Sequence, residues 1–173
     1  MTFRILVAYA SKHGSTAEIA KKIGETLRTA GLDVDVLAAD KVKDVAPYAA
    51  VVLGSAIYDG HWQKEAVKLL DDYKPLLTKI PVWLFSSGPM SDGDPATLVQ
   101  GWHIPSAQQA VADYIHARDI ALFNGAIDIG KLTSAERQIV KEFKFVVGDY
   151  RDWTAINNWC VSIAASLRPE VAE

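Results

Sequence analysis

The sequence predicts an α/β fold of the doubly wound type, with five parallel strands in the order 2-1-3-4-5 and extra helices toward the C-terminus. Short runs of apolar and β-branched residues alternate with amphipathic helical patterns along the chain. This alternation is typical of parallel strands joined by right-handed helical crossovers. Polar turns rich in serine and glycine follow three of the strand runs. In such sheets ligands bind beyond the carboxyl ends of the strands, where the strand order reverses.

The first half of the chain supplies three predicted strands and two predicted helices. An apolar run predicts a strand over Phe3–Ala8. A stripe of apolar residues at helical spacing predicts a helix over Ser15–Ala30, which Gly31 ends. The remaining elements of this half are strands over Asp33–Leu37 and Ala49–Leu53 and a helix over Lys64–Leu77.

The second half completes the sheet and then extends it. We expect strands over Pro81–Phe85 and Ile120–Phe123, with a helix over Ser106–His116 between them. The connection Met90–Ile104 is longer than a usual strand-to-helix loop, and loops of this length are often functional or disordered. Two further helices follow the last strand. Their start and packing signals are the capping box of Thr133 and Glu136, the cap Asp152, and the stripe Ile156, Cys160, Ile163 and Leu167. We expect a frayed tail over Pro169–Glu173.

Composition excludes several classes of protein. A length of 173 residues suits one domain over residues 1–173. The net charge of −3 gives no electrostatic case for nucleic acid. One cysteine and four histidines exclude an internal disulfide and are poor material for a metal site. The apolar runs are too short to span a membrane, and the first residues do not resemble a signal peptide. We therefore expect a cytoplasmic protein, with peripheral attachment to the inner face of the membrane left open.

The turn after the first strand is a candidate phosphate site. It runs Ser11-Lys12-His13-Gly14-Ser15-Thr16 and leads directly into a helix. Backbone N–H groups at a helix N-terminus lack partners and lie at the positive end of the helix dipole. The spacing matches neither a nucleoside-triphosphate loop nor a dinucleotide fingerprint, so a single phosphate monoester without metal fits best. The alternative is a tight turn with Ser15 capping the helix and with Lys12 and His13 solvated.

Two further turns lie at the same predicted edge. The segment Ser55–Trp62 after the third strand contains two aromatic residues and Gly60, which suits an apolar, planar ring. Its alternative is an ordinary loop whose aromatic residues cap the core, and the more frequent role of a residue such as His61 is to orient a loop rather than to transfer protons. The turn Ser86–Pro89 offers N–H groups and hydroxyls to the edge of such a ring, or is an ordinary turn.

The three turns together resemble the FMN site of flavodoxins. More narrowly, the chain is similar to the menaquinone-dependent protoporphyrinogen oxidase branch of that superfamily, through Gly54–Ile57, Gly60–Trp62 and Gly148–Trp153. The resemblance implies that FMN contacts Ser11, Lys12, His13, Gly14, Ser15, Thr16, Ser55, Ala56, Ile57, Tyr58, Asp59, Gly60, Ser86, Ser87 and Gly88. It assigns no catalytic side chain other than the weak candidate His61, because the flavin carries the chemistry.

The resemblance implies an FMN-dependent oxidoreductase that acts in heme biosynthesis. Hydride or electrons would pass from a reduced small-molecule substrate, such as protoporphyrinogen IX, through FMN to a quinone. The alternatives are a flavodoxin-type electron carrier that serves a redox-protein partner, and a flavin-free binding domain. Met90, Tyr58 and Trp102 either form a platform for substrate or quinone or pack the long loop onto the domain. The oligomeric state is left open.

Overall fold

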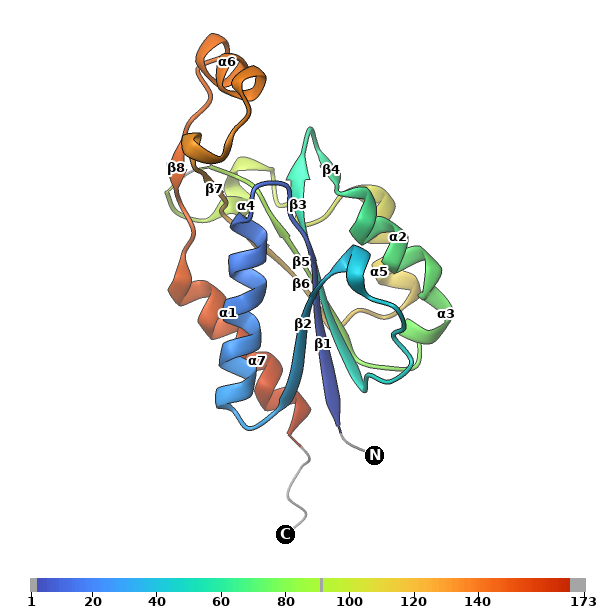
Figure 1. Cartoon of the computed structure of the whole chain (residues 1–173). Coiled ribbons are helices and arrows are strands. Elements are labelled where there is room, and N and C mark those ends of the chain that lie inside the picture. Colours follow the sequence, from blue (N-terminus) through green and yellow to red (C-terminus); the bar gives the residue numbers. More distant parts are fainter. Residues whose placement is uncertain (1–2, 91, 169–173) are drawn as a thin grey trace.

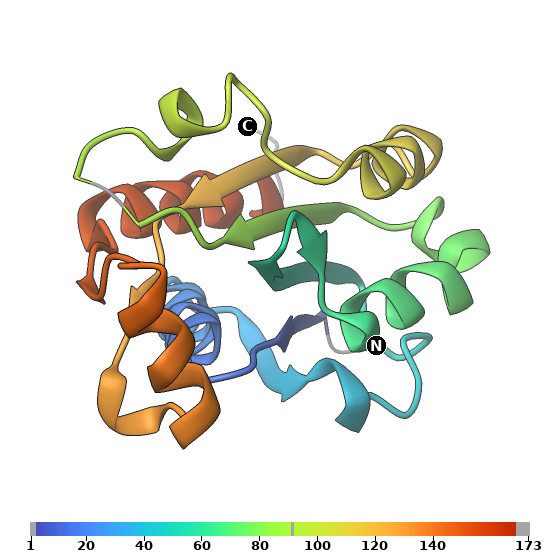
Figure 2. The same ribbon diagram turned by 90° about the horizontal axis from the view of Figure 1, so that it is seen from above.

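A computed structural model describes residues 3–90 and 92–168 and contains the predicted parallel sheet. The strands lie in the order β2-β1-β3-β5-β6 (Figures 1 and 2). Every neighbouring pair on this path is parallel. The predicted order is confirmed, because the additional strand β4 lies off this path. The strands are β1 (Arg4–Ala10), β2 (Asp33–Ala38), β3 (Ala50–Tyr58), β4 (His61–Trp62), β5 (Val82–Ser87) and β6 (Asp119–Phe123).

Helices cover both faces of the sheet (Figure 1). On one face, α1 (Ser15–Thr29) and α7 (Trp153–Leu167) pack against each other and the sheet. The opposite face carries α2 (Lys64–Asp72), α3 (Lys74–Leu77) and α5 (Ser106–Tyr114). Each face therefore has its own apolar cluster, and the sheet separates the two. The predicted stripes of α1 and α7 are confirmed as core, since all their members are buried: Ile19, Ile23, Leu27, Ile156, Cys160, Ile163 and Leu167.

Two predicted helices differ in extent from those observed. The helix expected over Lys64–Leu77 is divided at Tyr73, whose ψ of 8° ends α2. Pro75 explains the break, because it lacks an N–H group and its ring clashes with a preceding helical turn. The helix expected over Ser106–His116 ends at Tyr114, and His116 adopts a positive φ of 54°. The connection 90–104 also contains a short helix, α4 (Pro95–Leu98), capped by Asp94.

Residues 126–149 form an insertion between the last strand and the last helix. It consists of β7 (Ala126–Ile127), the 3-10 turn η2 (Ile129–Lys131), α6 (Ser134–Glu142) and β8 (Gly148–Asp149). The strands β7 and β8 pair antiparallel and form its base. The predicted capping box of α6 is confirmed, since Thr133 and Glu136 exchange both bonds. Figure 1 shows α6 projecting beyond the carboxyl ends of the sheet strands, which is the end where we expected the ligand. The predicted tail, Pro169–Glu173, lies outside the described residues.

Candidate active site

The three predicted turns meet at the carboxyl edge of the sheet, where buried hydrogen bonds join them. Thr16 Oγ1 and Ser87 Oγ lie 2.7 Å apart and link the turn after β1 to the end of β5. Trp62 Nε1 donates to Ser86 Oγ at 2.8 Å and links β4 to β5. All four side chains are buried. The turns therefore form one cross-linked surface.

The first turn holds a helix N-terminus open toward this surface. Gly14 precedes α1 with a φ of 95°, a conformation that only glycine adopts at little cost. Its N–H donates to Ser11 Oγ at 3.0 Å. The alternative of a Ser15 cap is wrong, because Gly14 occupies the N-cap and no side chain makes a capping hydrogen bond there. The N–H groups at this helix end thus have no intrahelical partner and are available to an anion.

The segment after β3 is a hairpin rather than the loop that we expected. β3 continues to Tyr58, turns through Asp59 and Gly60, and returns as β4. The two turn residues have φ values of 50° and 74°, as a tight hairpin turn requires. The strand is longer than expected because Ser55 and Ala56 still pair with Ser86 and Ser87 of β5 before the chain reverses. Ser55 Oγ further fixes the hairpin by donating to Ala56 O and accepting from the N–H of Gln63, both at 2.8 Å.

Tyr58 carries an aromatic ring at the tip of this hairpin. Its side chain is exposed, in contrast to the buried Trp62, which packs with the core on the α2 face. Lys12 Nζ lies 5.5 Å from the centre of the Tyr58 ring, and the imidazole of His13 meets the ring edge-on. Partial burial, with a smaller contribution from Glu136, raises the pKa of Tyr58, so its hydroxyl stays neutral. The hairpin tip and the first turn therefore lie in contact.

Close backbone approaches shape the third turn. A side chain at Gly88 would put its Cβ 3.2 Å from Ile57 Cβ, and one at Gly125 would come equally close to Gly88 Cα. The N–H of Gly88 donates to Phe123 O at 3.2 Å, and that of Gly125 donates to Pro89 O at 2.9 Å. Larger residues would force these segments apart. The ends of β3, β5 and β6 are thus held together at the expected ligand edge.

The insertion reaches the first turn through Glu136. Glu136 Oε1 lies 2.8 Å from Lys12 Nζ and 3.2 Å from His13 Nε2. The hydrogen bond from Lys12, with help from the N–H of Thr133, lowers the pKa of Glu136 to about 2. The carboxylate is therefore ionised at all physiological pH values. It lies beside the candidate phosphate turn, where it contacts Lys12 and His13.

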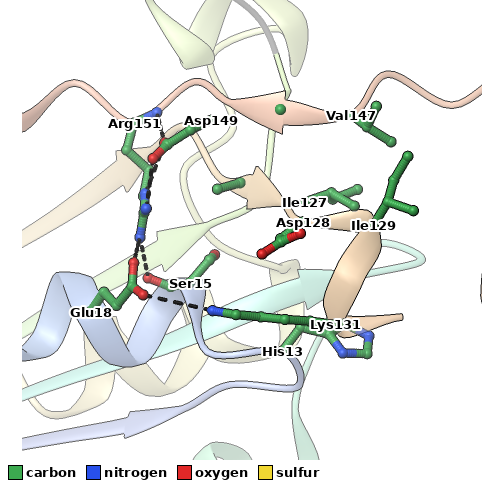
Figure 3. A pocket seen from close by; sticks show the side chains of 12 residues that line it. His13, Ser15, Glu18, Ile127, Asp128, Ile129, Lys131, Val147, Asp149 and Arg151 are labelled. Atoms are coloured by element: carbon green, nitrogen blue, oxygen red, sulfur yellow. Dashed lines mark hydrogen bonds and ion pairs between the residues drawn. The ribbon is translucent and has the colours of Figure 1, made fainter. Parts of the chain in front are cut away.

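A second set of charges lies on the other side of the helix N-terminus. A cavity of about 560 Å³ lies between α1 and the insertion, and Figure 3 shows the side chains that line it. Arg151 reaches across it, binding Asp149 through two nitrogens and contacting Glu18 Oε2 and Ser15 O at 2.5 and 3.2 Å. Lys131 Nζ lies 3.8 Å from the second oxygen of Glu18. These hydrogen bonds raise the pKa of Arg151 and lower that of Asp149.

Sequence reasoning missed the roles of Arg151, Lys131 and Glu18. The motif Gly148–Trp153 contained Arg151, but the neighbouring residues suggested only a capped, docked helix. That interpretation of Asp152 is confirmed, since it caps α7 by accepting from the N–H of Ala155 at 3.0 Å. The guanidinium of Arg151 also stacks over Trp153, 4.7 Å from the ring centre. No local pattern indicated that this arginine meets α1.

Other predicted residues lie apart from this cluster. His61 is exposed on β4 and pairs in register with Tyr58. Trp102 lines a cavity with Asp119 and Ile120, at the amino end of β6, so it shares no platform with Tyr58. Within residues 3–90 and 92–168 no cluster of metal-ligating side chains occurs. In the same ranges no helix is both long and apolar enough to cross a membrane.

The residues at the carboxyl edge fit FMN. The open helix N-terminus beside Ser11 and Ser15 suits a phosphate, and the exposed Tyr58 ring suits contact with an aromatic system. Asn124 gives independent support. Its side chain is 3% exposed at the end of β6, its Nδ2 donates to Gly93 O, and its Oδ1 has no partner among the described residues. A buried acceptor of this kind is costly unless a further donor reaches it.

Comparison with known proteins agrees with the fold. A family model described as a flavodoxin domain matches residues 6–153. A flavodoxin from the domain Archaea is 17% identical with a TM-score of 0.60, covering 94% of this chain and 97% of its own. Oxidised flavodoxin 2 from Bacillus cereus is 19% identical with a TM-score of 0.57, covering 95% of this chain and 99% of its own.

A larger protein shows the same fold in one part of its chain. Rubredoxin oxygen:oxidoreductase from Desulfovibrio gigas is 15% identical with a TM-score of 0.62, and the match covers 99% of this chain and 38% of that one. No curated protein matches the sequence. The family match spans most of the chain, and the fold and the open helix N-terminus agree with it. The chain belongs to the flavodoxin domain family.

Proposed function

We propose that this protein is an FMN-dependent oxidoreductase that takes electrons from a reduced small-molecule substrate and passes them to a quinone. The proposed reaction resembles the menaquinone-dependent dehydrogenation of protoporphyrinogen IX. The observation that carries the proposal is the insertion 126–149, which is anchored on the candidate phosphate turn by Lys12 and Glu136. An added structure at this position supplies surface for a substrate beside the cofactor, which a carrier without its own substrate does not need.

The residues of the chain divide the work of holding the cofactor. FMN supplies the redox chemistry when bound. The N–H groups at the start of α1, with Ser11 and Ser15, would hold the phosphate. Lys12 would balance part of the phosphate charge, in competition with the carboxylate of Glu136, which contacts both Lys12 and His13. The exposed ring of Tyr58 would lie against the flavin, while Ser86 and Ser87 set the positions of the strand ends.

The proposal extends to the surroundings of the protein. We place it in the cytoplasm, with a quinone as acceptor and no nucleic-acid partner. The low count of cysteines and the mild negative charge support this placement. A flavodoxin-type carrier that delivers electrons to a redox protein is the competing function, and the experiment below separates the two.

The test combines cofactor binding with turnover. The purified full chain is titrated with FMN by flavin fluorescence, and Ser15→Val serves as the phosphate-turn variant with exposed Ser134→Val as its control. We expect binding that Ser15→Val weakens about tenfold through the lost hydroxyl contact. The reconstituted protein is then supplied with protoporphyrinogen IX and a soluble menaquinone analogue. Oxidation of the substrate at the expense of the quinone is the expected result.

Two outcomes contradict the proposal. A chain that does not bind FMN would end any flavin-based function. A chain that binds FMN, oxidises neither protoporphyrinogen nor related reduced substrates with quinone, and yet transfers electrons to redox proteins would be a carrier.

A further inference from the structure

The tip of the insertion, residues 129–147, exposes an unusual amount of apolar surface. Its exposed apolar side chains are Ile129 at 47%, Ile139 at 47%, Phe143 at 67%, Phe145 at 56% and Val146 at 51%. None of the residues of α6 is buried, so this helix contributes nothing to a core. The two phenylalanine rings lie 6.1 Å apart and form one patch. Apolar patches of this kind on a soluble protein mark interaction sites.

Basic side chains border the same patch. Arg137 and Lys141 are four residues apart on α6, and Lys144 follows the helix. Together with Val140 and Phe145 these three line a groove of about 430 Å³. The described structure gives neither lysine an ion pair, and both are exposed. Apolar side chains flanked by free cations are typical of protein segments that rest on a lipid surface.

The charge of the tip is opposite to that of the rest of the chain. Residues 129–147 carry four basic and two acidic residues, a net charge of +2, whereas the whole chain carries −3. One residue of each sign is paired with a residue outside the tip, Glu136 with Lys12 and Lys131 with Glu18, so the net charge of the remaining residues of the tip is also +2. The tip is therefore attracted to an anionic surface while the net charge of the remainder opposes contact, which would orient the molecule.

The same charges argue against a second copy of the chain as the occupant. A symmetric contact through the tip would place Lys141 and Lys144 of one protomer against the same lysines of its partner. An anionic lipid surface instead accepts the phenylalanines between its headgroups and pairs with the lysines. Charge complementarity thus selects the lipid surface.

We propose that the tip of the insertion docks the protein on anionic membranes, with Phe143 and Phe145 entering the interface and Arg137, Lys141 and Lys144 contacting the headgroups. The inference deepens the proposed function and rests on it for its meaning in the reaction, since a quinone acceptor is dissolved in the bilayer. The ion pairs of Glu136 connect the docking tip directly to the candidate phosphate turn. Docking would therefore bring the carboxyl edge of the sheet toward the bilayer (Figure 1).

The test is co-sedimentation of the full chain, reconstituted with FMN, with vesicles of phosphatidylcholine and phosphatidylglycerol or of phosphatidylcholine alone. We expect binding to the anionic vesicles that salt weakens and much weaker binding to the neutral ones. Lys141→Glu with Lys144→Glu should lower the partition coefficient about 30-fold or more. Phe143→Ser with Phe145→Ser should lower it about tenfold or more.

Matched controls alter exposed residues outside the tip. Lys21→Glu with Lys79→Glu makes the same charge change, and Tyr114→Ser removes an aromatic ring that is 59% exposed. Tyr114→Ser should bind vesicles within about twofold of the unchanged chain. Lys21→Glu with Lys79→Glu should show only the effect of the altered net charge, which is much smaller than the loss caused by the same change at Lys141 and Lys144. Far-ultraviolet circular dichroism and FMN content verify that all variants are folded.

Three results would overturn the docking proposal. The first is an unchanged chain that ignores anionic vesicles. The second is tip variants that bind as tightly as their controls. The third is a concentration-dependent dimer in sedimentation that Phe143→Ser with Phe145→Ser dissolves, which would assign the patch to a second copy. Turnover with a soluble quinone analogue, measured on the same variants, tests the proposed function separately, because it does not require a membrane.

Discussion

The carboxyl edge of the sheet and the insertion 126–149 lie side by side, but different forces hold them. At the sheet edge, buried hydroxyls and an indole join the strand ends, as between Thr16 and Ser87. The insertion has no buried residue in its helix and is tied down by charges, chiefly Glu136 and Arg151. Buried polar bonds are insensitive to salt, whereas exposed ion pairs are screened by it. The molecule therefore combines a rigid cofactor edge with a neighbour that can adapt.

The largest effect should come from filling the sheet beneath the site. A Cβ at Gly54 would lie 2.0 Å from the ring of Phe85, which is fully buried. We expect Gly54→Ala to destabilise the fold by about 3 kcal/mol or more, because the ring has no room to move. The matched change in the insertion is Gly130→Ala, whose Cβ would meet only the Asp128 side chain at 3.1 Å. Urea unfolding should show a loss below about 1 kcal/mol there. Equal losses would contradict the contrast between the regions.

The second effect tests the buried bond between the strand ends. Thr16→Val and Ser87→Ala each leave one hydroxyl without its partner, so each should cost about 1–2 kcal/mol of unfolding free energy. The double variant should cost less than the two single losses together, because the bond is lost only once. Denaturant unfolding of all four proteins gives the coupling. Strict additivity would mean that the hydroxyls act independently.

The third effect concerns the attachment of the insertion to α1. Arg151→Lys keeps the charge but loses the two-pronged contact with Asp149 and the simultaneous reach to Glu18. We expect a loss of about 1 kcal/mol, confined to local opening. Hydrogen exchange should quicken over residues 126–149 and stay unchanged in β3. The control is Arg168→Lys at the exposed end of α7, which should alter neither.

The smallest effect on stability should follow removal of the Glu136 charge. Glu136→Gln frees Lys12 and His13, so FMN affinity should rise a fewfold at low salt and the gain should shrink as salt is added. The control is Glu142→Gln, an exposed residue of the same helix without an ion pair in the described structure. Flavin fluorescence titration measures both. Weaker binding in the Gln variant would show that the carboxylate supports the phosphate turn rather than competing with it.

The pKa of Glu136 also fixes how this contact responds to pH. The folded pKa, about 2, lies below the ordinary value of 4.5, so the contact stabilises the fold fully above pH 4.5. That contribution is lost progressively as the pH falls from 4.5 toward 2. Hydrogen exchange of the insertion should therefore be constant from pH 7 to pH 5 after correction for the intrinsic rate. Opening within that range would point to a different titrating group.

The contrast between the regions also explains what could be predicted from sequence. The buried stripes of α1 and α7 follow from local periodicity, whereas the strand order follows from the fold class that the alternation of strands and helices indicates. The structure confirms both. The helix break at Tyr73 could have been predicted from Pro75. It was missed because the helical spacing of apolar residues continues past the proline. The hairpin at Asp59–Gly60 was missed because the residues on either side of it suit a loop as well as a short pair of strands.

The site is predictable only where it is local. The first turn could be recognised because its hydroxyls, glycine and helix start are consecutive. The contact between Arg151 and Glu18 joins residues 133 positions apart, and the pair Lys12–Glu136 is similarly distant. The ion-pair partner of a surface charge depends on which residues the fold brings near it, and the periodicity of the sequence does not indicate that partner. The assignment of individual residues to FMN stays a prediction for the titrations above.

The single cysteine of the chain is buried in the apolar cluster that α1 and α7 form against the sheet. Cys160 is fully buried there, and burial raises the pKa of its thiol to about 12, so almost no thiolate forms at neutral pH. Alkylating reagents can reach it only when this part of the core opens. The rate of thiol modification would thus report how often the core opens, without any engineered label. The same measurement could be made in the presence of lipid or flavin.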